Sequence, residues 1–489
     1  MWAKIKDFLF RNKTPGQTVA KNSIWLSISN FGGRIIKAVI VIYGARVLGT
    51  AQWGVFSYAT TLAAFFTLFM DPGVNAIMMR DLSKTSEEER TTFFSTTIVM
   101  KIFLLVTGVV FVLVAAPYFS TLPGAKALIP LAALIIVCDT TREFFSAFMR
   151  SMEKMEWEAA VFLLTNAAIV VLGFVFLALH PTAHSFAWAY AAGAAIGAIA
   201  AIFAVRRYIK NILEHFSSKL ILPIFRSAWP FAVTGALGLL LTSSDILIIS
   251  WMRSASDVGI YAAAIRIIQV LYLIPMVLQF STLPLFGRLA GRDDQKFRDT
   301  FERILGIIFL ASVPLALGGA ILGTEIMRLV FGPAYAAGGL SFRILMLSML
   351  VDFPAALVSN AIFAYDHQKS LIICSAIGGI GNVVFDLLFI PIWGIAGSAV
   401  ATLLAQTLSN GYLWHRMNTI NHFRVLPRLK NVVIAGVIMA CVTLILMLLG
   451  TEVVVNIALS AIAYFLVLRI LREPLLIDTK RIVLGGVSA

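Results

Sequence analysis

The sequence predicts an all-α membrane protein of about fourteen transmembrane helices, arranged as two six-helix lobes followed by two further helices. Of its 489 residues, 60% are hydrophobic and only 13% are charged, and the mean hydropathy is +0.90. A soluble domain carries roughly 25% charged residues, so this chain has too few polar side chains to coat a globule in water. Apolar runs of about 20 residues, the length that crosses a bilayer, recur from one end to the other.

Turn residues separate the apolar runs and set the predicted helix boundaries. Clear examples are the segments Pro117 to Gly124, His180-Pro181 and Pro391 to Gly394. In chain order, the spans are predicted at residues 22–47, 52–80, 91–116, 127–150, 156–180, 184–207, 226–251, 257–288, 298–322, 335–364, 369–391, 395–416, 430–449 and 453–471.

Basic residues fall almost entirely on alternate loops of this arrangement. One set of loops, together with both chain ends, carries 29 Lys and Arg residues, whereas the other set carries only Arg46, Lys126, Arg253 and Arg328. Cytoplasmic loops are enriched in Lys and Arg, so both termini are predicted to be cytoplasmic and the number of spans even. The net charge of +14 is then explained by loops that face anionic lipid, and no nucleic-acid partner is expected.

The sequence offers no sign of a metal centre or a nucleotide site. Each of Cys138, Cys374 and Cys441 lies inside an apolar run, and none forms a CxxC or a Cys/His pair. We interpret them as small apolar side chains and expect no metal. A GxxxxGK[ST] loop is also missing, so direct use of ATP is not expected. No cofactor is predicted, and an ion gradient or the membrane potential is the expected source of energy.

The second half of the chain resembles the first at a spacing of about 205 residues. Gly54 to Ala59 matches Gly259 to Ala264, and the turn Met152-Glu153-Lys154 resembles Tyr365-Asp366-His367. Two related sets of six helices in the same orientation predict a parallel repeat, with a substrate cavity between the lobes. The predicted domains are residues 1–208 for the first lobe, 209–225 for a cytoplasmic linker, 226–420 for the second lobe, and 421–489 for the last two helices and the cytoplasmic tail.

Ionisable residues inside the predicted spans are the candidate site, because a charge in the bilayer is costly unless it faces a cavity or a partner. The basic residues are predicted to be lumenal cations that bind the substrate: Arg34, Lys37, Lys101, Arg142, Arg266 and Arg343. The acidic residues are predicted to couple to an ion or to form ion pairs: Asp71, Asp139, Glu143, Asp245, Asp352 and Asp386.

Two of these groups have a structural interpretation beside the functional one. Arg34 and Lys37 lie three residues apart on one helix face, and form either an anion clamp or a pair satisfied by a neighbouring carboxylate. Arg266 and Asp245 are expected at similar depths, as a structural ion pair or as a lumenal pair that opens when substrate binds.

The other charged positions are equally open. Asp139, Arg142 and Glu143 share one helix face, which favours a self-neutralising network, with Lys101 as a further partner or as a separate lumenal cation. Asp71-Pro72-Gly73 interrupts the second span as a hinge or a static kink. Arg343 and Asp352 are nine residues apart, too far for a local pair.

The stretch ARVLGTAQWGVFS, from Ala45 to Ser57, followed by Asp71-Pro72-Gly73, resembles the first two helices of Wzx-type polysaccharide transporters. A matching SSDILIISWMRSASDVGIYAAAIRIIQ runs from Ser243 to Gln269. These flippases belong to the multidrug/oligosaccharidyl-lipid/polysaccharide exporter superfamily, and the resemblance covers most of the chain. Related lipid II flippases have functional arginines on the first and eighth helices, which adds weight to Arg34 and Arg266.

The resemblance implies a V-shaped bundle with a central lumen and a transporter rather than an enzyme. The implied cargo is an undecaprenyl-pyrophosphate-linked oligosaccharide, such as an O-antigen, capsule or exopolysaccharide repeat unit. Alternating access would carry it from the cytoplasmic to the outer leaflet of the bacterial inner membrane. Further implied partners are membrane lipids and the polysaccharide polymerase with its chain-length machinery.

Two alternatives stay open. An ion-coupled multidrug or toxin antiporter of the same superfamily exports cationic drugs, so its lumen should be acidic or apolar. The six basic residues in the predicted spans count against this alternative, although six carboxylates in the spans formally balance their charge. A membrane polymerase or ligase needs a large outer loop that holds catalytic Arg or His, and every outer loop predicted here is short.

Overall fold

The computed structural model describes residues 15–82, 87–209, 212 and 214–476. All regular secondary structure in these ranges is helical. Eight of the basic residues used to predict the topology lie outside the described residues: Lys4, Lys6, Arg11, Lys13, Lys84, Lys210, Lys480 and Arg481.

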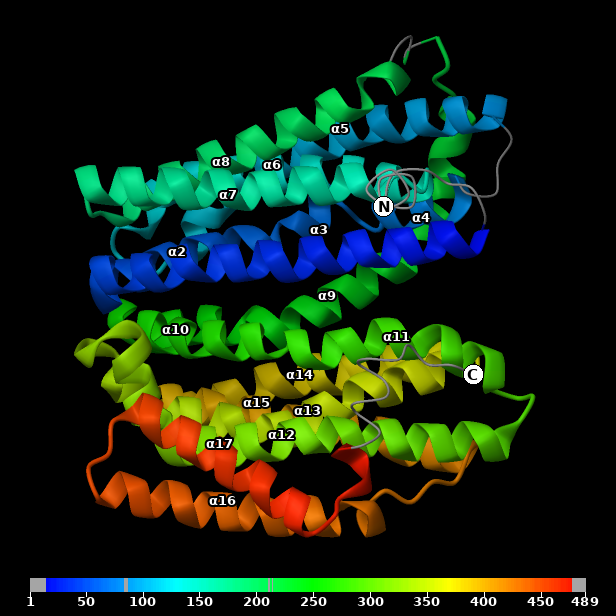
Figure 1. Ribbon diagram of the computed structural model, residues 1–489. Helices are drawn as coiled ribbons and strands as arrows, with labels where there is room; N and C mark the ends of the chain where they lie inside the picture. Colours follow the sequence, from blue (N-terminus) through cyan, green and yellow to red (C-terminus); the bar gives the residue numbers. More distant parts are fainter. Residues whose placement is uncertain (1–14, 83–86, 210–211, 213, 477–489) are drawn as a thin grey trace, which may run out of the picture. The chain divides into compact units, whose positions relative to one another are not determined.

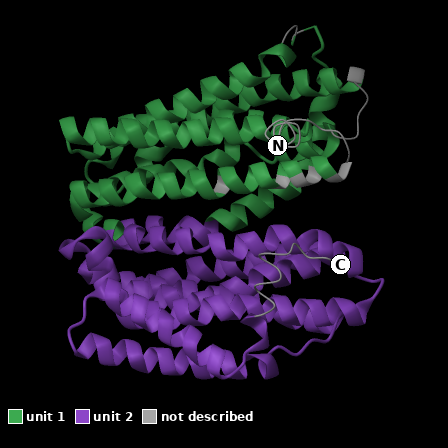
Figure 2. Ribbon diagram, in the orientation of Figure 1, with its two compact units in different colours: residues 1–239, 253–259 green, residues 240–252, 260–489 purple. Residues whose placement is uncertain are grey.

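The chain forms two compact units (Figure 2). Unit 1 comprises residues 1–239 with 253–259, and unit 2 comprises residues 240–252 with 260–489. The predicted lobes follow the sequence repeat, whereas this division follows compactness and cuts through two helices, α9 and α10. The predicted lobe boundaries therefore stay a prediction.

Unit 1 is a bundle of long helices in which distant segments pack side by side (Figure 1). The helix α2 packs against α6 and α7, and α8 packs against both α6 and α7. The elements are α2 (Pro15–Phe65), α3 (Thr67–Met70), α4 (Val74–Leu82), α5 (Glu87–Phe119), α6 (Ala125–Ser151), α7 (Met155–Leu179), α8 (Ala183–Val205), the 3-10 turns η1 (Arg206–Tyr208) and η2 (Ser218–Leu220), and the first part of α9 (Ile221–Met252).

Two breaks divide the first part of unit 1. Gly49, with φ 71° and ψ 174°, interrupts α2 in a conformation that glycine adopts without steric cost. The predicted first and second spans therefore meet at Gly49. The predicted break at Asp71-Pro72-Gly73 is also present, since α3 ends at Met70, α4 begins at Val74, and the helix direction changes by 49°.

Unit 2 pairs α12 with α13, α13 with α15, and α14 with α15. The last two helices, α16 and α17, form a hairpin against α12, held by an Arg428–Glu302 ion pair of 3.0 Å and by Tyr464, whose OH donates to the Leu310 carbonyl. The elements are the rest of α9, α10 (Ala255–Leu271) from residue 260 on, α11 (Leu273–Leu289), α12 (Asp294–Phe331), η3 (Pro333–Gly338), α13 (Gly339–Ala364), α14 (Gln368–Trp393), α15 (Ile395–Ile420), η4 (Leu426–Leu429), α16 (Lys430–Leu448) and α17 (Val453–Ile470).

The number of helices agrees with the prediction of about fourteen spans. By length and composition, ten helices in the described ranges can cross a membrane, or eleven with the bent pair of α2 and α4. Helices α6 and α15 are of similar length but more polar, and Gly49 divides α2 into two. The all-α membrane fold class is confirmed.

The predicted repeat is visible in the local structure of two turns. Glu153 after α6 and Asp366 after α13 both have positive φ, 57° and 61°, which is uncommon for residues other than glycine. The next amide closes the same hydrogen bond in each case, from Lys154 to the Met149 carbonyl and from His367 to the Ile362 carbonyl. Both helices thus end in the same capping motif, at positions that the sequence repeat makes equivalent.

The repeated glycine motif also has a structural reason. Gly54 on α2 and Gly259 on α10 both belong to unit 1, where these two helices touch backbone to backbone. An added Cβ at Gly54 would collide with the carbonyl oxygen of Ala255, and one at Gly259 with that of Thr50. Larger side chains at either position would force the helices apart.

Candidate functional site

Arg34 places a charge near the middle of a long membrane helix. It lies nineteen residues after the start of α2 and fifteen before Gly49, or about 28 Å and 22 Å along the axis. Its side chain is exposed and makes no hydrogen bond or ion pair within the described part of the chain. An unpartnered guanidinium is costly in hydrocarbon, so we expect this part of α2 to border water or a polar ligand.

Lys37 lies about one turn further along α2. Its side chain is half-buried, and its Nζ is 5.2 Å from the centre of the Tyr190 ring on α8. This cation–π contact orients the ammonium group without neutralising its charge. Because three residues separate Lys37 from Arg34, the two cations share one face of the helix.

Lys101 and Arg142, in contrast, lie inside unit 1. Lys101 is 2% exposed, and its Nζ is 3.5 Å from Asp71 Oδ2 at the break between α3 and α4. Asp71 also accepts a hydrogen bond from the amide of Asn75 in the first turn of α4. Lys101, predicted as a partner of the acidic residues of the fourth span or as a separate lumenal cation, is instead a buried member of an ion pair with Asp71, because α5 turns it toward that residue.

The acidic and basic residues of α6 form the expected network. Arg142, which is 7% exposed, lies 2.9 Å from Glu143 and 3.5 Å from Asp139. The network continues from Glu143 to Arg150 at 3.2 Å, and from Arg150 to Glu158 of α7 at 2.9 Å. These charges neutralise one another within the bundle, which leaves Arg142 little freedom to contact a substrate.

Unit 2 contains buried carboxylates of a different kind. Asp245 of α9 and Asp386 of α14 are 3% and 0% exposed. The hydroxyl of Tyr261 donates to Asp245 Oδ2 at 2.6 Å and that of Thr402 at 3.1 Å, while Ser398 donates to Asp386 Oδ1 at 2.8 Å. All of these partners are neutral.

Asn382 links the two carboxylates. Its Nδ2 lies 2.5 Å from Asp245 Oδ1 and 3.4 Å from Asp386 Oδ2, so these two oxygens are no more than 5.9 Å apart. The Asn382 Oδ1 atom is buried and accepts no hydrogen bond from the described residues. We call Asp245, Asp386, Asn382, Ser398 and Thr402 the oxygen cluster.

The oxygen cluster has the chemistry of a site for a small cation. Two carboxylates buried together without a positive charge are strongly unfavourable unless a proton or a cation joins them. Carboxylate, amide and hydroxyl oxygens are suitable ligands for hard cations. The described residues contain no group of three or more His, Cys, Asp or Glu side chains that could hold a metal ion. Two carboxylates with neutral oxygens could hold a small cation such as a proton or a sodium ion.

A third buried carboxylate, Asp352 of α13, has neutral partners as well. Asn410 Nδ2 donates to it at 2.8 Å, and the Tyr272 hydroxyl donates to its other oxygen. Asp352 precedes Asp366 by fourteen residues, as Asp139 precedes Glu153, so the two acids are equivalent in the repeat. Their environments differ, because Asp139 has an arginine partner and Asp352 has none among its hydrogen-bond partners.

The remaining predicted cations are placed differently from expectation. The suggested ion pair between Asp245 and Arg266 is not formed, because Asp245 is bonded to neutral groups, and Arg266 Nη1 donates to Gln269 one turn away at 2.9 Å. Arg343 lies only four residues after the start of α13, because residues 333–338 form the separate turn η3, and it is 3.9 Å from Glu325. It is thus near a helix end rather than in mid-span.

The neutral members of the oxygen cluster were not predicted from the sequence. Asn382 and Asp386 are four residues apart on α14, and Ser398 and Thr402 are four residues apart on α15. Such i, i+4 pairs of polar side chains in otherwise apolar helices were the available signal. The packing of α14 on α15 brings these two pairs together, and hydrogen bonds from Asn382 and Thr402 link them to Asp245 of α9.

Comparison with known families gives two overlapping matches. A family model described as "Polysaccharide biosynthesis protein" matches residues 19–290, more than half of the chain. A second model, described as MatE, matches residues 230–388.

Comparison with individual proteins points to flippases. The "Probable flippase AglR" of Haloferax volcanii is 31% identical over 170 residues, which cover 34% of this chain and 36% of that protein. The "Probable low-salt glycan biosynthesis flippase Agl15" of the same organism is 20% identical over 79% of this chain and 81% of its own length. The solved structure titled "Lipid II flippase MurJ, inward closed conformation" is 18% identical, with a TM-score of 0.76 over 93% of this chain and all of that one. At this identity the structural likeness shows the fold.

Proposed function

Because the chain belongs to the polysaccharide biosynthesis protein family, we propose that it is a flippase for a polyprenyl-pyrophosphate-linked oligosaccharide. It is a multi-pass membrane transporter rather than an enzyme. In a bacterium the carrier would be undecaprenyl pyrophosphate and the membrane the inner membrane, with both termini in the cytoplasm. Alternating access would move the glycan from the cytoplasmic to the outer leaflet.

The exposed guanidinium of Arg34 is the observation that carries this proposal. A pyrophosphate cannot cross hydrocarbon unaided, since removing its water costs many kcal/mol. Arginine offers phosphate oxygens paired, charge-assisted hydrogen bonds, and Arg34 has no competing partner in the described residues. Lys37 adds a second positive charge on the same face. We assign the pyrophosphate contact to these two residues, and leave Lys101 and Arg142 out because they are buried in ion pairs.

The oxygen cluster supplies the proposed coupling step. A proton or sodium ion that enters it would neutralise part of the charge on Asp245 and Asp386 and draw α9, α14 and α15 together. Because the ion and the substrate would bind different helices, coupling would act through the packing of those helices rather than through direct contact. Partners such as a polysaccharide polymerase would then act after the flip.

Variants of Arg34 test the proposal. Removal of one charge-assisted hydrogen bond costs about 1.5–3 kcal/mol, so Arg34→Ala should weaken substrate binding roughly tenfold to hundredfold. Arg34→Lys should keep part of the function, since the charge remains. The measurement is surface glycan in a deletion strain that makes each variant at wild-type abundance, together with the amount of lipid-linked repeat unit that accumulates inside.

Arg46→Ala is the matched control, because it removes an arginine from the same helix near Gly49 and should leave glycan display intact. Normal display by Arg34→Ala at normal abundance would show that Arg34 does not bind the substrate.

The match to MatE supports a second candidate function, that of an ion-coupled multidrug antiporter. The same deletion strain separates the two. Drug hypersensitivity without accumulation of lipid-linked glycan would support the antiporter, and the reverse result would support the flippase.

A further inference from the structure

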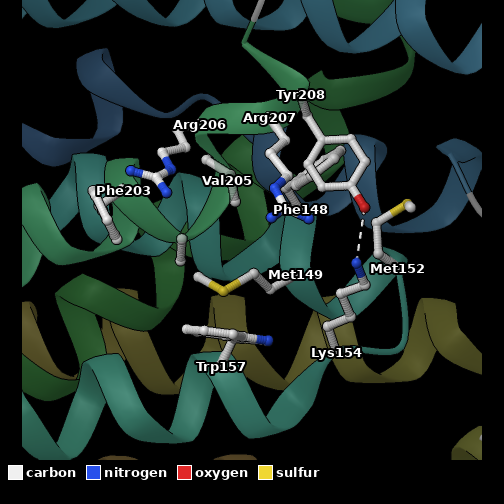
Figure 3. A pocket seen from close by; sticks show the side chains of 11 residues that line it. Phe148, Met149, Met152, Lys154, Trp157, Phe203, Val205, Arg206, Arg207 and Tyr208 are labelled. Carbon is white, nitrogen blue, oxygen red and sulfur yellow. Dashed lines mark hydrogen bonds between the residues drawn. The ribbon is translucent and has the colours of Figure 1, made fainter. Parts of the chain in front are cut away.

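A pocket of about 250 Å³ lies at one end of unit 1, apart from the candidate functional site (Figure 3). The turn between α6 and α7 forms one wall, and the end of α8 with η1 forms the other. Its lining consists of Phe148, Met149, Met152, Lys154, Trp157, Phe203, Ala204, Val205, Arg206, Arg207 and Tyr208.

Three cations and no carboxylate line this pocket. In Figure 3, Arg206 lies toward Phe203 and Lys154 toward Tyr208, with Arg207 between them in this view. The guanidinium carbon of Arg206 is 3.9 Å from the centre of the Phe203 ring, and Lys154 Nζ donates to the Tyr208 hydroxyl at 2.8 Å. These contacts hold the side chains in place and leave their charges uncompensated.

Glu153, which precedes Lys154, is exposed and does not line the pocket, and the next two acidic residues form ion pairs elsewhere. Glu156 forms an ion pair with the buried Lys21 at 2.8 Å, and Glu158 with Arg150 at 2.9 Å. Neither guanidinium of Arg206 and Arg207 has an ion-pair partner in the described part of the chain. The positive charge is thus available to an anion from outside the protein.

The pocket is positioned at a membrane surface. Apolar side chains that are exposed in the protein, and therefore lie against lipid, lead up to it along α8: Ile199, Ile202 and Phe203 are 66%, 42% and 59% exposed. Trp157, at the rim, is 53% exposed, as is typical of the aromatic residues at a bilayer interface. The density of Lys and Arg here predicts the cytoplasmic side.

The second half of the chain does not repeat the basic residues of this pocket. At the equivalent turn, Tyr365 donates to Asp294 at 2.7 Å and receives a hydrogen bond from Asn421 at 2.8 Å. Thr419 and Ile420 occupy the positions equivalent to Arg206 and Arg207, at the same spacing that relates Glu153 to Asp366. The topology alone therefore does not require a cationic pocket.

We propose that this pocket binds the phosphodiester headgroup of an anionic phospholipid from the adjacent leaflet. The two guanidinium groups and Lys154 would contact the phosphate oxygens, Trp157 and Tyr208 would lie at the level of the glycerol, and the acyl chains would run along the exposed face of α8. This inference is independent of the cargo and of the proposed function.

Lipid titration with native mass spectrometry tests the site. The purified full-length protein is titrated with phosphatidylglycerol, with phosphatidylcholine and with inorganic phosphate. Wild type should bind phosphatidylglycerol at least tenfold more tightly than phosphatidylcholine, and Arg206→Gln/Arg207→Gln should lose that preference. Lys219→Gln/Arg226→Gln is the matched control, because it removes two exposed charges between the same predicted spans, outside the pocket, and should keep the preference.

Three results would overturn the proposal. Equal binding of the two lipids by wild type would show that no headgroup site exists. An equal loss of the preference in both double variants would show that the total basic charge, not the pocket, attracts the lipid. Displacement of phosphatidylglycerol by millimolar phosphate would assign the pocket to a soluble phosphate. All variants replace exposed residues, so circular dichroism is expected to confirm unchanged folding.

Discussion

Replacing Asp386 with asparagine removes one buried charge of the oxygen cluster while keeping the shape of the side chain. The amide oxygen can still accept the hydrogen bond from Ser398, and the substitution weakens only the long hydrogen bond of 3.4 Å from Asn382. We therefore expect Asp386→Asn to fold, and to be more stable than wild type when no cation is supplied.

The magnitude follows from the geometry. The facing oxygens of Asp245 and Asp386 are at most 5.9 Å apart. At an effective dielectric constant of about 20, two full charges at that separation repel each other by about 3 kcal/mol. A sodium ion or proton bound at the proposed site would offset this repulsion in wild type, and Asp386→Asn removes it permanently. A change of this size corresponds to a shift of several degrees in the unfolding temperature.

The assay is the thermal unfolding of the purified protein with and without Na⁺, with choline as the replacement cation. Wild type should be stabilised by Na⁺, whereas Asp386→Asn should unfold at the same temperature in both buffers. Asp352→Asn is the control, because it neutralises another buried carboxylate of unit 2 and should keep the Na⁺ effect. Repeating the comparison with acidification in place of Na⁺ identifies a proton as the ligand.

Two outcomes would refute the reasoning. If neither Na⁺ nor acidification changes the unfolding temperature of the wild-type protein, the cluster takes up no cation. An Asp386→Asn variant that keeps the full wild-type response would place the cation elsewhere.

Removing one partner of a fully buried ion pair costs about 3–5 kcal/mol, and Lys101→Met should destabilise the protein by somewhat less because the Asp71 side chain is 20% exposed. Adding Asp71→Asn should restore most of the lost stability. Chemical denaturation measures this, and a double variant no better than Lys101→Met would contradict the pairing. A reporter fused at Ala489 should be active only in the cytoplasm, as the distribution of basic residues predicts, and periplasmic activity would reverse the topology. The purified protein should not hydrolyse ATP when lipid-linked glycan is added, since the sequence has no phosphate-binding loop; stimulated release of phosphate would oppose ion coupling.

The sequence by itself determined the membrane fold class, the approximate number of helices and the internal repeat. Local properties are sufficient for these features, because each membrane helix satisfies its own backbone hydrogen bonds and needs only an apolar run of adequate length. The boundary between the first two spans, which the structure places at Gly49, and the break at Asp71-Pro72-Gly73 were also predicted, since glycine and proline act on the backbone at their own positions.

Only the tertiary structure decided what each intramembrane charge does. Arg34 and Lys101 look alike in the sequence, yet the first is exposed without a partner in the described residues and the second is buried against Asp71. The oxygen cluster depends on Asn382, Ser398 and Thr402, which are neutral and stand out only after α9, α14 and α15 pack together. The physical reason is that the environment of a charge depends on the rotation of its helix and on neighbours far away in the chain, and packing across the whole bundle sets both.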